Sequence, residues 1–240
     1  MTHGSLFSGI GGFELGARMA GIETVWSCEI ERFQRNVLKK NFPNTKQYED
    51  IRKLHNPEYV DIISGGFPCQ DISIAGKGCG ITGERSGLWC EMFRIIREIR
   101  PKYIIIENSP MLLVRGFERV LCDLYKIGYN AEWQCLQAKN FGFCHKRERL
   151  FCVAYSNSLR WNEKKNETSI FSKKISETSG WELGRAISRE IRNKNNSEVL
   201  RNDDGLPDVV DRIKSCGNAV IPQIAYYIFE CIKEFDKQLK

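Results

Sequence analysis

No apolar stretch of this sequence reaches the roughly 18–20 residues that a membrane-spanning helix requires. The N-terminus, Met-Thr-His-Gly-Ser, also lacks the basic start and the apolar core of a secretory signal. Apolar residues make up 42% of the chain and charged residues 28%, proportions that are ordinary for a soluble globular protein. We therefore expect a cytoplasmic protein that makes no contact with a membrane.

Histidine is scarce, and the cysteines are not spaced for metal binding. The chain has three histidines, and none of its ten cysteines forms a Cys-x-x-Cys pair, so we expect neither a zinc site nor any other metal site. Without a secretory signal, the thiols are expected to stay reduced. Four of them lie in apolar surroundings and are predicted to be small core residues, namely Cys122, Cys135, Cys152 and Cys231.

Neither sign of charge dominates the chain. Its 36 Lys and Arg residues against 30 Asp and Glu residues leave a formal net charge of +6. A mild positive balance is compatible with a nucleic-acid partner, because cationic side chains displace counterions from phosphates. Such a balance is also common in proteins that bind no nucleic acid, so charge alone does not identify a partner.

Short apolar runs alternate with amphipathic stretches as far as residue 155. Runs rich in β-branched residues predict strands, and helical periodicity with terminal Gly or Pro predicts the helices between them. The strands are expected at residues 5–8, 23–28, 60–64, 103–107, 131–136 and 150–154, and the helices before residue 20 and at residues 30–40, 88–99 and 117–127. This alternation predicts an α/β fold with a doubly wound sheet, which binds ligands outside the carboxyl ends of its strands.

The composition changes after residue 155. Residues 156–205 contain eight Ser and seven Asn with few apolar anchors, which is typical of a disordered insert or of a small, loop-rich module. A regular pattern resumes near the end, where residues 219–235 predict one amphipathic helix that returns to the first domain. We therefore divide the chain into residues 1–155, 156–206 and 207–240.

A glycine-rich turn, Phe-Ser-Gly-Ile-Gly-Gly-Phe at residues 7–13, follows the first predicted strand. Glycines there let the backbone approach a ligand closely at a helix N-terminus. Glu29 ends the next strand, where an acid can bind the two hydroxyls of a ribose, and Asp50-Ile51 could contact adenine. These features favour a nucleoside cofactor, and a nicotinamide cofactor fits them as well. The alternative is an ordinary tight turn with solvated acids.

Two further candidates follow buried strands. Gly-Gly-Phe-Pro-Cys-Gln at residues 65–70 places the Cys69 thiol on a stiff loop at the ligand-binding edge, where nearby cations would lower its pKa and make it nucleophilic. A triple-isoleucine run brings Glu107 to the same edge, where burial would raise the pKa of the carboxyl and allow it to protonate a ring nitrogen. An inert loop cysteine and a capping acid are the alternatives.

A basic run, His-Lys-Arg-Glu-Arg at residues 145–149, leads into the last predicted strand. In an extended chain, Arg147 and Arg149 lie on the same face. Guanidinium groups suit the recognition of phosphates or carbonyl oxygens, because their donors form a planar fork. The alternative is a solvated surface.

Taken in order, these motifs resemble one known family. Together with Glu-Asn-Ser at residues 107–109 and Gly-Asn-Ala-Val-Ile-Pro at residues 217–222, they closely resemble the cytosine-C5 DNA methyltransferases of bacterial or phage type. The resemblance covers residues 1–155 and about 207–240. It implies a Rossmann-like, S-adenosylmethionine-dependent methyltransferase domain, a short target-recognition segment at residues 156–206, and a C-terminal segment that returns to the catalytic domain.

The resemblance also implies an activity and a set of site residues. A methyl group would pass from S-adenosylmethionine to C5 of a flipped cytosine through a covalent adduct with Cys69. The catalytic residues would be Cys69, Glu107, Arg149 and Arg147; the cofactor-binding residues Phe7, Gly9, Gly11, Glu29, Asp50, Ile51, Pro68, Asn218 and Val220; and the DNA-binding residues Gln70, Ser73, Lys77 and Arg85. The implied partners are double-stranded DNA and, functionally, a cognate restriction endonuclease, and a monomer is expected.

Three features depart from the family pattern. Ser109 replaces the usual valine after Glu-Asn, His145 replaces the usual glutamine of the basic motif, and the recognition segment has only about 50 residues. Two alternatives follow, an RNA-directed cytosine-C5 methyltransferase and a catalytically weak DNA-binding relative. The Gly-Phe-Pro-Cys-Gln loop favours the DNA branch, because the tRNA branch tends to have Pro-Pro-Cys-Gln. The intact candidates Cys69, Glu107 and Arg149 favour an enzyme.

Overall fold

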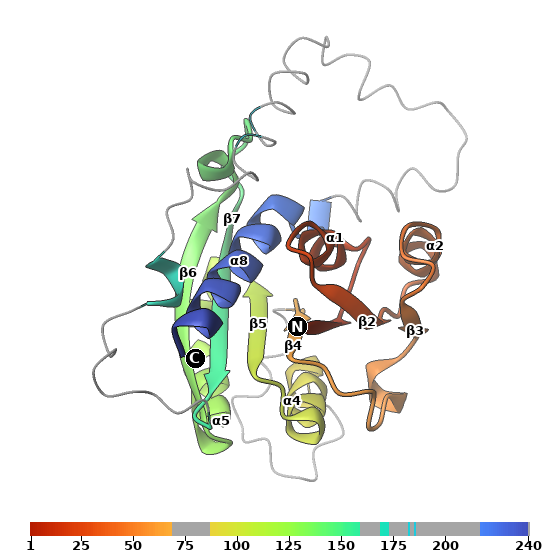
Figure 1. The fold of residues 1–240 in the computed structure, drawn as a ribbon, viewed down its shortest axis with the longest axis horizontal. Coiled ribbons are helices and arrows are strands. Elements are labelled where there is room, and N and C mark those ends of the chain that lie inside the picture. The colour runs from red at the N-terminus through yellow and green to blue at the C-terminus, as the bar shows by residue number, and fades with distance from the viewer. Residues whose placement is uncertain (69–86, 159–168, 173–181, 183–184, 186–216, 240) are drawn as a thin grey trace.

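The computed structural model describes residues 1–68, 87–158, 169–172, 182, 185 and 217–239. Its centre is a seven-stranded sheet in the order β3-β2-β1-β4-β5-β7-β6 (Figure 1). The strands are β1 (Thr2–Leu6), β2 (Glu23–Cys28), β3 (Lys46–Tyr48), β4 (Ile62–Gly65), β5 (Tyr103–Asn108), β6 (Tyr129–Gln137) and β7 (Glu148–Ser156). With helices between the strands, the sheet confirms the predicted doubly wound α/β fold.

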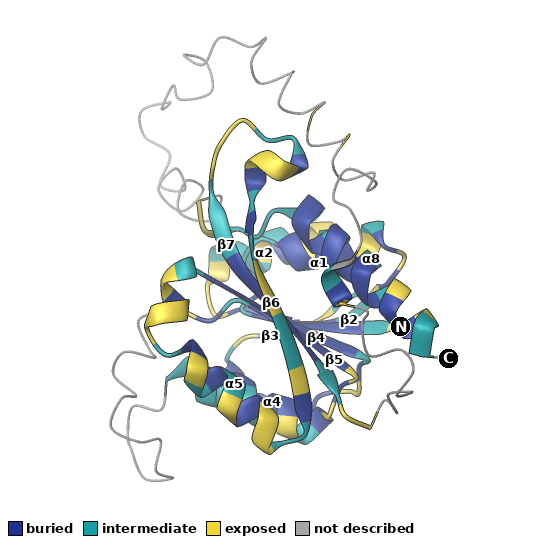
Figure 2. Ribbon diagram, turned by 90° about the vertical axis from the view of Figure 1, so that its left-hand side faces the viewer, coloured by how far each residue is buried: buried dark blue, intermediate teal, exposed yellow. Residues whose placement is uncertain are grey.

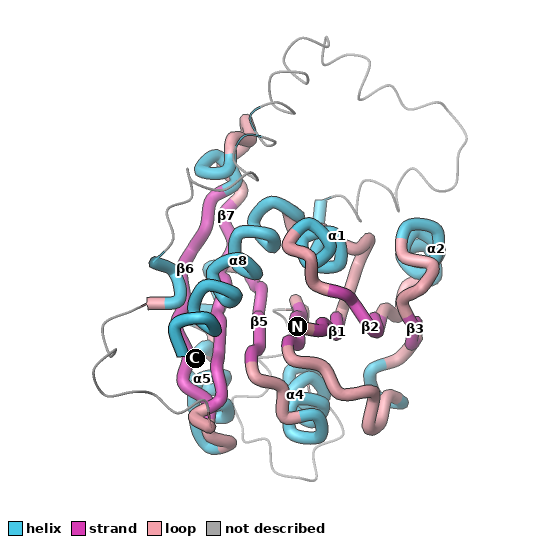
Figure 3. The backbone as a smooth tube through the Cα atoms, in the orientation of Figure 1, coloured by secondary structure: helices cyan, strands magenta, loops and turns pink. Residues whose placement is uncertain are grey.

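The strand directions bring the functional ends of most strands to one edge. The first five strands are mutually parallel, and their registers pair Leu6 with both Cys28 and Gly65, and Gly65 with Ile106. β7 runs antiparallel to β5 and to β6, and the long β6–β7 pair forms one side of the sheet (Figure 3). The first residues of β7 therefore lie where the parallel strands end, at the edge that binds ligands in such folds.

Helices cover both faces of the sheet (Figure 2). α1 and α8 pack on one face, whereas α4 and α5 pack on the other. The helices are α1 (Gly12–Met19), α2 (Arg32–Asn41), α4 (Leu88–Ile99), α5 (Phe117–Lys126) and α8 (Pro222–Leu239), with short 3-10 helices η1 (Ile51–Lys53), η2 (Pro110–Val114), η3 (Ala138–Phe141) and η5 (Ile170–Ser172). No helix in the described ranges is long and apolar enough to cross a membrane.

The central strand β5 explains why both faces of the sheet are apolar. Successive side chains of a strand point to opposite faces. Ile104 and Ile106 pack with α4 and α5, whereas Tyr103 and Ile105 pack with α1 and α8, and all four are buried. A strand that is covered on both sides requires a continuous apolar run, which the three consecutive isoleucines supply.

Several element boundaries differ from those predicted, and two of the differences have a clear cause in the backbone. The first strand spans Thr2–Leu6 instead of residues 5–8, because Phe7 and Gly9 have φ angles of 55° and 57° that end the extended chain. The last helix begins at Pro222 instead of residue 219. Proline suits the first helical position, because its φ is already helical and its missing N–H would have no partner there.

The predicted core cysteines are only partly in the core. Cys152 and Cys231 are buried, and Cys135 is half-buried. Cys122 is exposed, because α5 turns Val120 and Leu124 towards the sheet and Cys122 to the opposite side. The described cysteines that carry free thiols are Cys28, Cys90, Cys122, Cys135, Cys144, Cys152 and Cys231.

The two ends of the described chain meet in a close helix contact. α1 and α8 lie side by side on the same face of the sheet. A Cβ atom added to Gly16 would lie 2.5 Å from the Cβ of Ala225 and 2.9 Å from the carbonyl oxygen of Pro222. Because part of this contact is backbone, the helices pack this closely only with glycine at position 16.

We expect Gly16→Ala to lower the free energy of unfolding by about 1–3 kcal/mol, the usual cost of overpacking, although alanine otherwise favours a helix interior over glycine. Urea denaturation measures this change. The double variant G16A/A225G should recover part of the loss, because it removes the nearest obstructing atom. A Gly16→Ala protein as stable as the wild type would show that α1 and α8 separate without cost.

Candidate active site

The predicted site residues that the structure describes come from several elements and gather at the carboxyl edge of the sheet. Glu29 follows β2, Asp50 follows β3, and Pro68 lies beyond the end of β4. Glu107 is the penultimate residue of β5, and Arg149 is the second residue of β7. The antiparallel direction of β7 is what places its start beside the end of β5.

A turn in a rare backbone conformation lies beside Glu29. Phe7 has a φ of 55° and Gly9 a φ of 57°, a region that is uncommon for aromatic residues and accessible to glycine. The Gly9 N–H donates a 2.7 Å hydrogen bond to one carboxylate oxygen of Glu29, and the Glu31 N–H donates a 2.9 Å bond to the other. A Cβ added to Gly9 would meet no described atom within 4 Å, so the backbone of this turn is accessible to a ligand.

Asp50 and Ile51 lie one strand further along the same edge. The Arg52 N–H donates a 3.0 Å hydrogen bond to the Asp50 carboxylate, and the Arg52 guanidinium pairs with it at 2.9 Å. The hydrogen bond from Arg52 holds the pKa of Asp50 below its usual value. Ile51 is buried in the core. The structure thus places both residues close to the end of β2 and gives Ile51 a packing role.

Glu107 and Arg149 form an ion pair between neighbouring strands. The Nε atom of Arg149 lies 3.1 Å from Oε1 of Glu107, and Glu107 is 8% exposed. Burial raises the pKa of the Glu107 carboxyl to about 7, although the guanidinium groups of Arg149 and Arg147 act in the opposite direction. A carboxyl group with this pKa can hold or release a proton at neutral pH, as a general acid requires.

Glu107 is fitted against the residues that precede Cys69. A Cβ atom added to Gly66 would lie 2.6 Å from Oε2 of Glu107, so only glycine leaves the carboxylate in place. The Asn108 side-chain amide donates a 2.8 Å hydrogen bond to the Phe67 carbonyl. Gly66 and Asn108 belong to the Gly-Gly-Phe-Pro-Cys-Gln and Glu-Asn-Ser motifs, but the sequence alone did not reveal these contacts.

Arg147 reaches the C-terminal segment. Its Nη1 atom donates a 2.7 Å hydrogen bond to the carbonyl oxygen of Ala219, which stands between the predicted cofactor residues Asn218 and Val220. A cavity of about 10 Å³ is lined by Glu107, both arginines and the residues that lead into α8, and this volume is about that of one water probe. The structure therefore brings Val220 to the catalytic candidates, whereas Asn218 is exposed.

Five predicted site residues lie outside the described residues, namely Cys69, Gln70, Ser73, Lys77 and Arg85, and so does most of the predicted recognition segment. Pro68, which directly precedes Cys69, is described and exposed. Within the part of the chain that the structure describes, no group of three or more His, Cys, Asp or Glu side chains could hold a metal ion.

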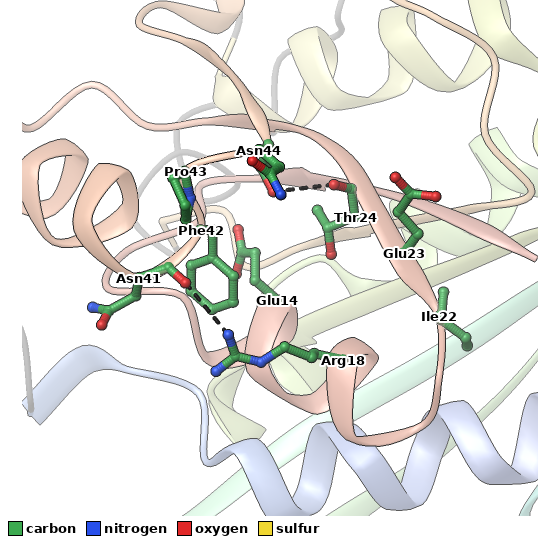
Figure 4. Close-up of a pocket in the computed structure, with 10 residues that line it drawn as sticks. Glu14, Arg18, Ile22, Glu23, Thr24, Asn41, Phe42, Pro43 and Asn44 are labelled. Carbon is green, nitrogen blue, oxygen red and sulfur yellow. Dashed lines mark hydrogen bonds between the residues drawn. The ribbon is translucent and has the colours of Figure 1, made fainter.

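A larger pocket, of about 250 Å³, lies between α1, the start of β2 and the end of α2 (Figure 4). It is lined by Glu14, Arg18, Ile22, Glu23, Thr24 and residues 41–45, and includes none of the predicted site residues. The Arg18 guanidinium lies 5.0 Å from the centre of the Phe42 ring and donates a 3.4 Å hydrogen bond to the Asn41 carbonyl. These contacts hold two walls of the pocket together.

Glu14 is the unusual residue of this pocket. It is fully buried, and neither of its carboxylate oxygens has a hydrogen-bond partner of good geometry among the described residues. Burial raises the pKa of Glu14 to about 7, with the nearby hydroxyl groups of Ser8 and Ser5 acting in the opposite direction. An acid in the first turn of a helix is commonly solvated, so the sequence contains no sign of this burial.

Comparison with protein families identifies the chain. Residues 1–205 match the family model described as C-5 cytosine-specific DNA methylase. Because this match covers most of the chain, and because the sheet is doubly wound with the candidate residues at its carboxyl edge, the fold is that of a methyltransferase. The chain belongs to the C-5 cytosine-specific DNA methylase family.

Individual proteins that resemble the chain are also named as methyltransferases. Type II methyltransferase M2.BsuMI of Bacillus subtilis is 38% identical over 158 residues, which cover 62% of this chain and 41% of that protein. Type II methyltransferase M.NgoFVII of Neisseria gonorrhoeae is 30% identical over 227 residues, which cover 89% of this chain and 60% of that protein. The chain therefore spans about half the length of these curated relatives.

Two solved structures resemble the fold. A protein described as a DNA modification methyltransferase encoded within an E. coli prophage has a TM-score of 0.56 at 26% identity, over 68% of this chain and 48% of that one. The Entamoeba histolytica methyltransferase EhMeth has a TM-score of 0.62 over 98% of both chains. At 16% identity, the second likeness concerns the fold alone.

The buried carboxyl of Glu14 leads to a prediction about stability. Its pKa is higher in the folded protein than the ordinary value of 4.5, so its contribution to stability is complete below pH 4.5 and is lost as the pH rises through about 7. A raised pKa of this size corresponds to about 3 kcal/mol at most. We therefore expect Glu14→Gln to be more stable than the wild type at pH 8, and the difference to vanish near pH 4.5.

Urea denaturation between pH 4.5 and pH 8 measures this difference. Glu23→Gln is a matched control, because Glu23 lines the same pocket but is exposed, and it should follow the wild-type profile. Glu107 titrates over the same range and is left in place in both variants, so part of the pH dependence will persist. Identical pH profiles for Glu14→Gln and the wild type would contradict the assignment.

Proposed function

We propose that the protein is a DNA cytosine-5 methyltransferase. It transfers a methyl group from S-adenosylmethionine to C5 of a cytosine flipped out of double-stranded DNA, with Cys69 as the covalent nucleophile. The observation that carries this proposal is the ion pair of Glu107 and Arg149 at 3.1 Å, beside the residues that precede Cys69. The match of residues 1–205 to the C-5 cytosine-specific DNA methylase family supports it.

The residues of the sheet edge fit an adenosine-containing cofactor. Glu29 places a carboxylate at the glycine-rich turn, where each oxygen accepts one backbone N–H and has a lone pair left for a ribose hydroxyl. Phe7, Gly9 and Gly11 would line one side, Asp50, Ile51 and Pro68 the other, and Asn218 and Val220 would complete the site. S-adenosylmethionine would supply an electrophilic methyl group at this position.

The cytosine ring must be activated, because C5 is a weak nucleophile. The Cys69 thiolate adds to C6, and a carbon–sulfur bond forms while the electron pair of the C5–C6 double bond moves into the ring. Glu107 donates its proton to N3, or shares it, which neutralises the charge that reaches this nitrogen. A pKa near 7 suits Glu107 to that donation at neutral pH.

C5 would then attack the methyl group that S-adenosylmethionine supplies. The new carbon–carbon bond would form as the methyl–sulfur bond breaks, S-adenosylhomocysteine would leave, and N3 would return its proton to Glu107. The proton on C5 passes to solvent, its electron pair restores the C5–C6 double bond, and the thiolate leaves C6. The target base must leave the helix first, because stacked neighbours cover the face of the ring that the thiolate attacks. Arg149 and Arg147 orient the flipped base, and Gln70, Ser73, Lys77 and Arg85 contact the DNA around it.

Residues 156–206 supply target recognition in this proposal, next to a catalytic domain of residues 1–155 that is completed by residues 207–240. The protein acts as a cytoplasmic monomer on double-stranded DNA. Its relatives are named Type II methyltransferases, and on that basis we propose that it functions beside a restriction endonuclease with the same target sequence.

Methyl transfer from radiolabelled S-adenosylmethionine to duplex DNA, with tRNA in parallel, tests the function. We expect label in DNA only. Cys69→Ser should abolish the transfer, because an alcohol at neutral pH is a far weaker nucleophile than a thiolate, and calorimetry should show that cofactor binding survives. DNA that carries 5-fluorocytosine at the target should form a complex that resists denaturation, since fluorine does not leave as a proton does.

Cys122→Ser is the matched control, because Cys122 is exposed on α5, and it should keep full activity and form the trapped complex. Near wild-type methylation by Cys69→Ser would exclude the covalent mechanism. Label in tRNA alone would assign the protein to the RNA-directed branch.

A second prediction concerns the cofactor. Glu29→Ala should weaken S-adenosylmethionine binding by about 1.5–3 kcal/mol, the usual contribution of hydrogen bonds to a charged group, and calorimetry measures it. Glu31→Ala is the control, because the Glu31 side chain is exposed and only its backbone N–H contacts Glu29. Equal affinities for the two variants would remove Glu29 from the cofactor site.

A further inference from the structure

Arg147 is held by a contact from a distant part of the chain. It precedes β7, and its Nη1 atom donates a 2.7 Å hydrogen bond to the carbonyl oxygen of Ala219. The two residues are 72 positions apart. The accepting carbonyl belongs to the short stretch that leads from Asn218 to Pro222, at the start of α8.

The same stretch is fixed from its other side by the glycine-rich turn. A Cβ atom added to Gly12 would lie 2.3 Å from the carbonyl oxygen of Val220 and 3.0 Å from its Cβ. Backbone therefore approaches backbone at this point, which only glycine permits. Ala219 and Val220 are thus held between Gly12, at the start of α1, and the guanidinium of Arg147.

The rest of the Arg147 guanidinium faces the catalytic candidates. Nε and Nη2 are buried and have no hydrogen-bond partner among the described residues. Arg147 lines the 10 Å³ cavity together with Glu107 and Arg149. Burial, together with the neighbouring charge of Arg149, lowers the pKa of Arg147, so the guanidinium is costly to hold there. Nε and Nη2 of Arg147 are thus buried donors without a described partner, beside the carboxyl of Glu107 that is proposed to bind the base. A hydrogen-bond acceptor on the base would satisfy them.

We propose that Arg147 is a positioning residue that links the cofactor segment at Ala219–Val220 to the pocket for the target base. One edge of its guanidinium holds the Ala219 carbonyl, and the other presents Nε and Nη2 to the base pocket. This inference rests on the proposed function. Because such a link acts in both directions, a cofactor bound against Val220 also stabilises the orientation of Arg147 that receives the base.

The experiment compares Arg147→Met with Arg149→Met by two measurements on the full-length protein. Hydrogen exchange of the peptide that contains Ala219 and Val220 is measured without ligand, and S-adenosylmethionine affinity is measured by calorimetry. We expect Arg147→Met to accelerate exchange in this peptide and to raise the Kd for S-adenosylmethionine roughly tenfold or more, as loss of a hydrogen bond from a charged group does. Arg149→Met should change neither, because Arg149 pairs with Glu107 and not with Ala219.

A conservative variant separates a donated hydrogen bond from simple packing. Arg147→Lys keeps a charged donor and should recover much of the lost affinity, which a variant that merely fills space would not do. Wild-type exchange and wild-type affinity in Arg147→Met would overturn the inference. A wild-type protein that fails to bind S-adenosylmethionine would instead overturn the proposed function, and the exchange measurement would then decide by itself whether Arg147 holds the C-terminal segment.

Discussion

The antiparallel direction of β7 is the constraint on which the candidate site depends. Glu107 is nearly buried, and a buried carboxylate is stable only beside a compensating charge or as the neutral acid. The register pairs Asn108 with Leu150, so Arg149 lies immediately beyond the paired end of β5. A parallel strand in this position would begin at the opposite edge of the sheet. The reversal of one strand thus gives Glu107 an ionic partner, which limits the rise that burial causes in the pKa of this carboxyl.

A second constraint joins the two ends of the described chain. Gly12 and Gly16 of α1 carry no side chain, and this lets the backbone before α8 and the first turns of α8 come into direct contact with α1. Further along, the Lys233 ammonium donates a 2.8 Å hydrogen bond to the Ala20 carbonyl at the end of α1. Helix α1, which begins at the glycine-rich turn, therefore packs against the segment before α8, and the Ala219 carbonyl of that segment accepts a hydrogen bond from Arg147. The glycine-rich turn, the segment that leads into α8 and the Glu107–Arg149 pair thus form one connected body.

Local sequence patterns predict the layout of the fold well. The runs of apolar residues locate the strands, and the rule that ligands bind beyond the carboxyl ends of strands locates the edge where Glu29 and Glu107 lie. The direction of β7 could not be predicted in this way, because an apolar run has the same pattern in either direction. The end of β1 differs from the prediction as well, since the turn at Phe7 depends on a left-handed φ that an aromatic residue rarely adopts.

The site is less predictable than the fold, because its contacts join residues that are distant in sequence. Nothing in a basic run reveals that Arg147 bonds to the carbonyl of Ala219, since any residue offers such an acceptor. The burial of Glu14 likewise depends on how the folded chain packs around α1. The Arg147 hydrogen bond is accepted by a backbone carbonyl, and the burial of Glu14 comes from the surrounding fold. Neither can be recognised from the types of residues involved.

The arrangement around Glu107 fits the proposed pairing of this strand acid with Cys69. Glu107 is held in place, because β5 lies inside the sheet and Arg149 forms an ion pair with the Glu107 carboxylate. The backbone that precedes Cys69 is fixed beside Glu107, because the Asn108 amide donates a 2.8 Å hydrogen bond to the Phe67 carbonyl and Gly66 leaves room for Oε2 of Glu107. Adjacent residues of a strand point to opposite faces of the sheet, so Glu107 can pair with Arg149 while Asn108 holds the backbone of Phe67, two residues before Cys69. One dipeptide at the end of β5 thereby places both the carboxyl that is proposed as the proton donor and the backbone that precedes the proposed nucleophile.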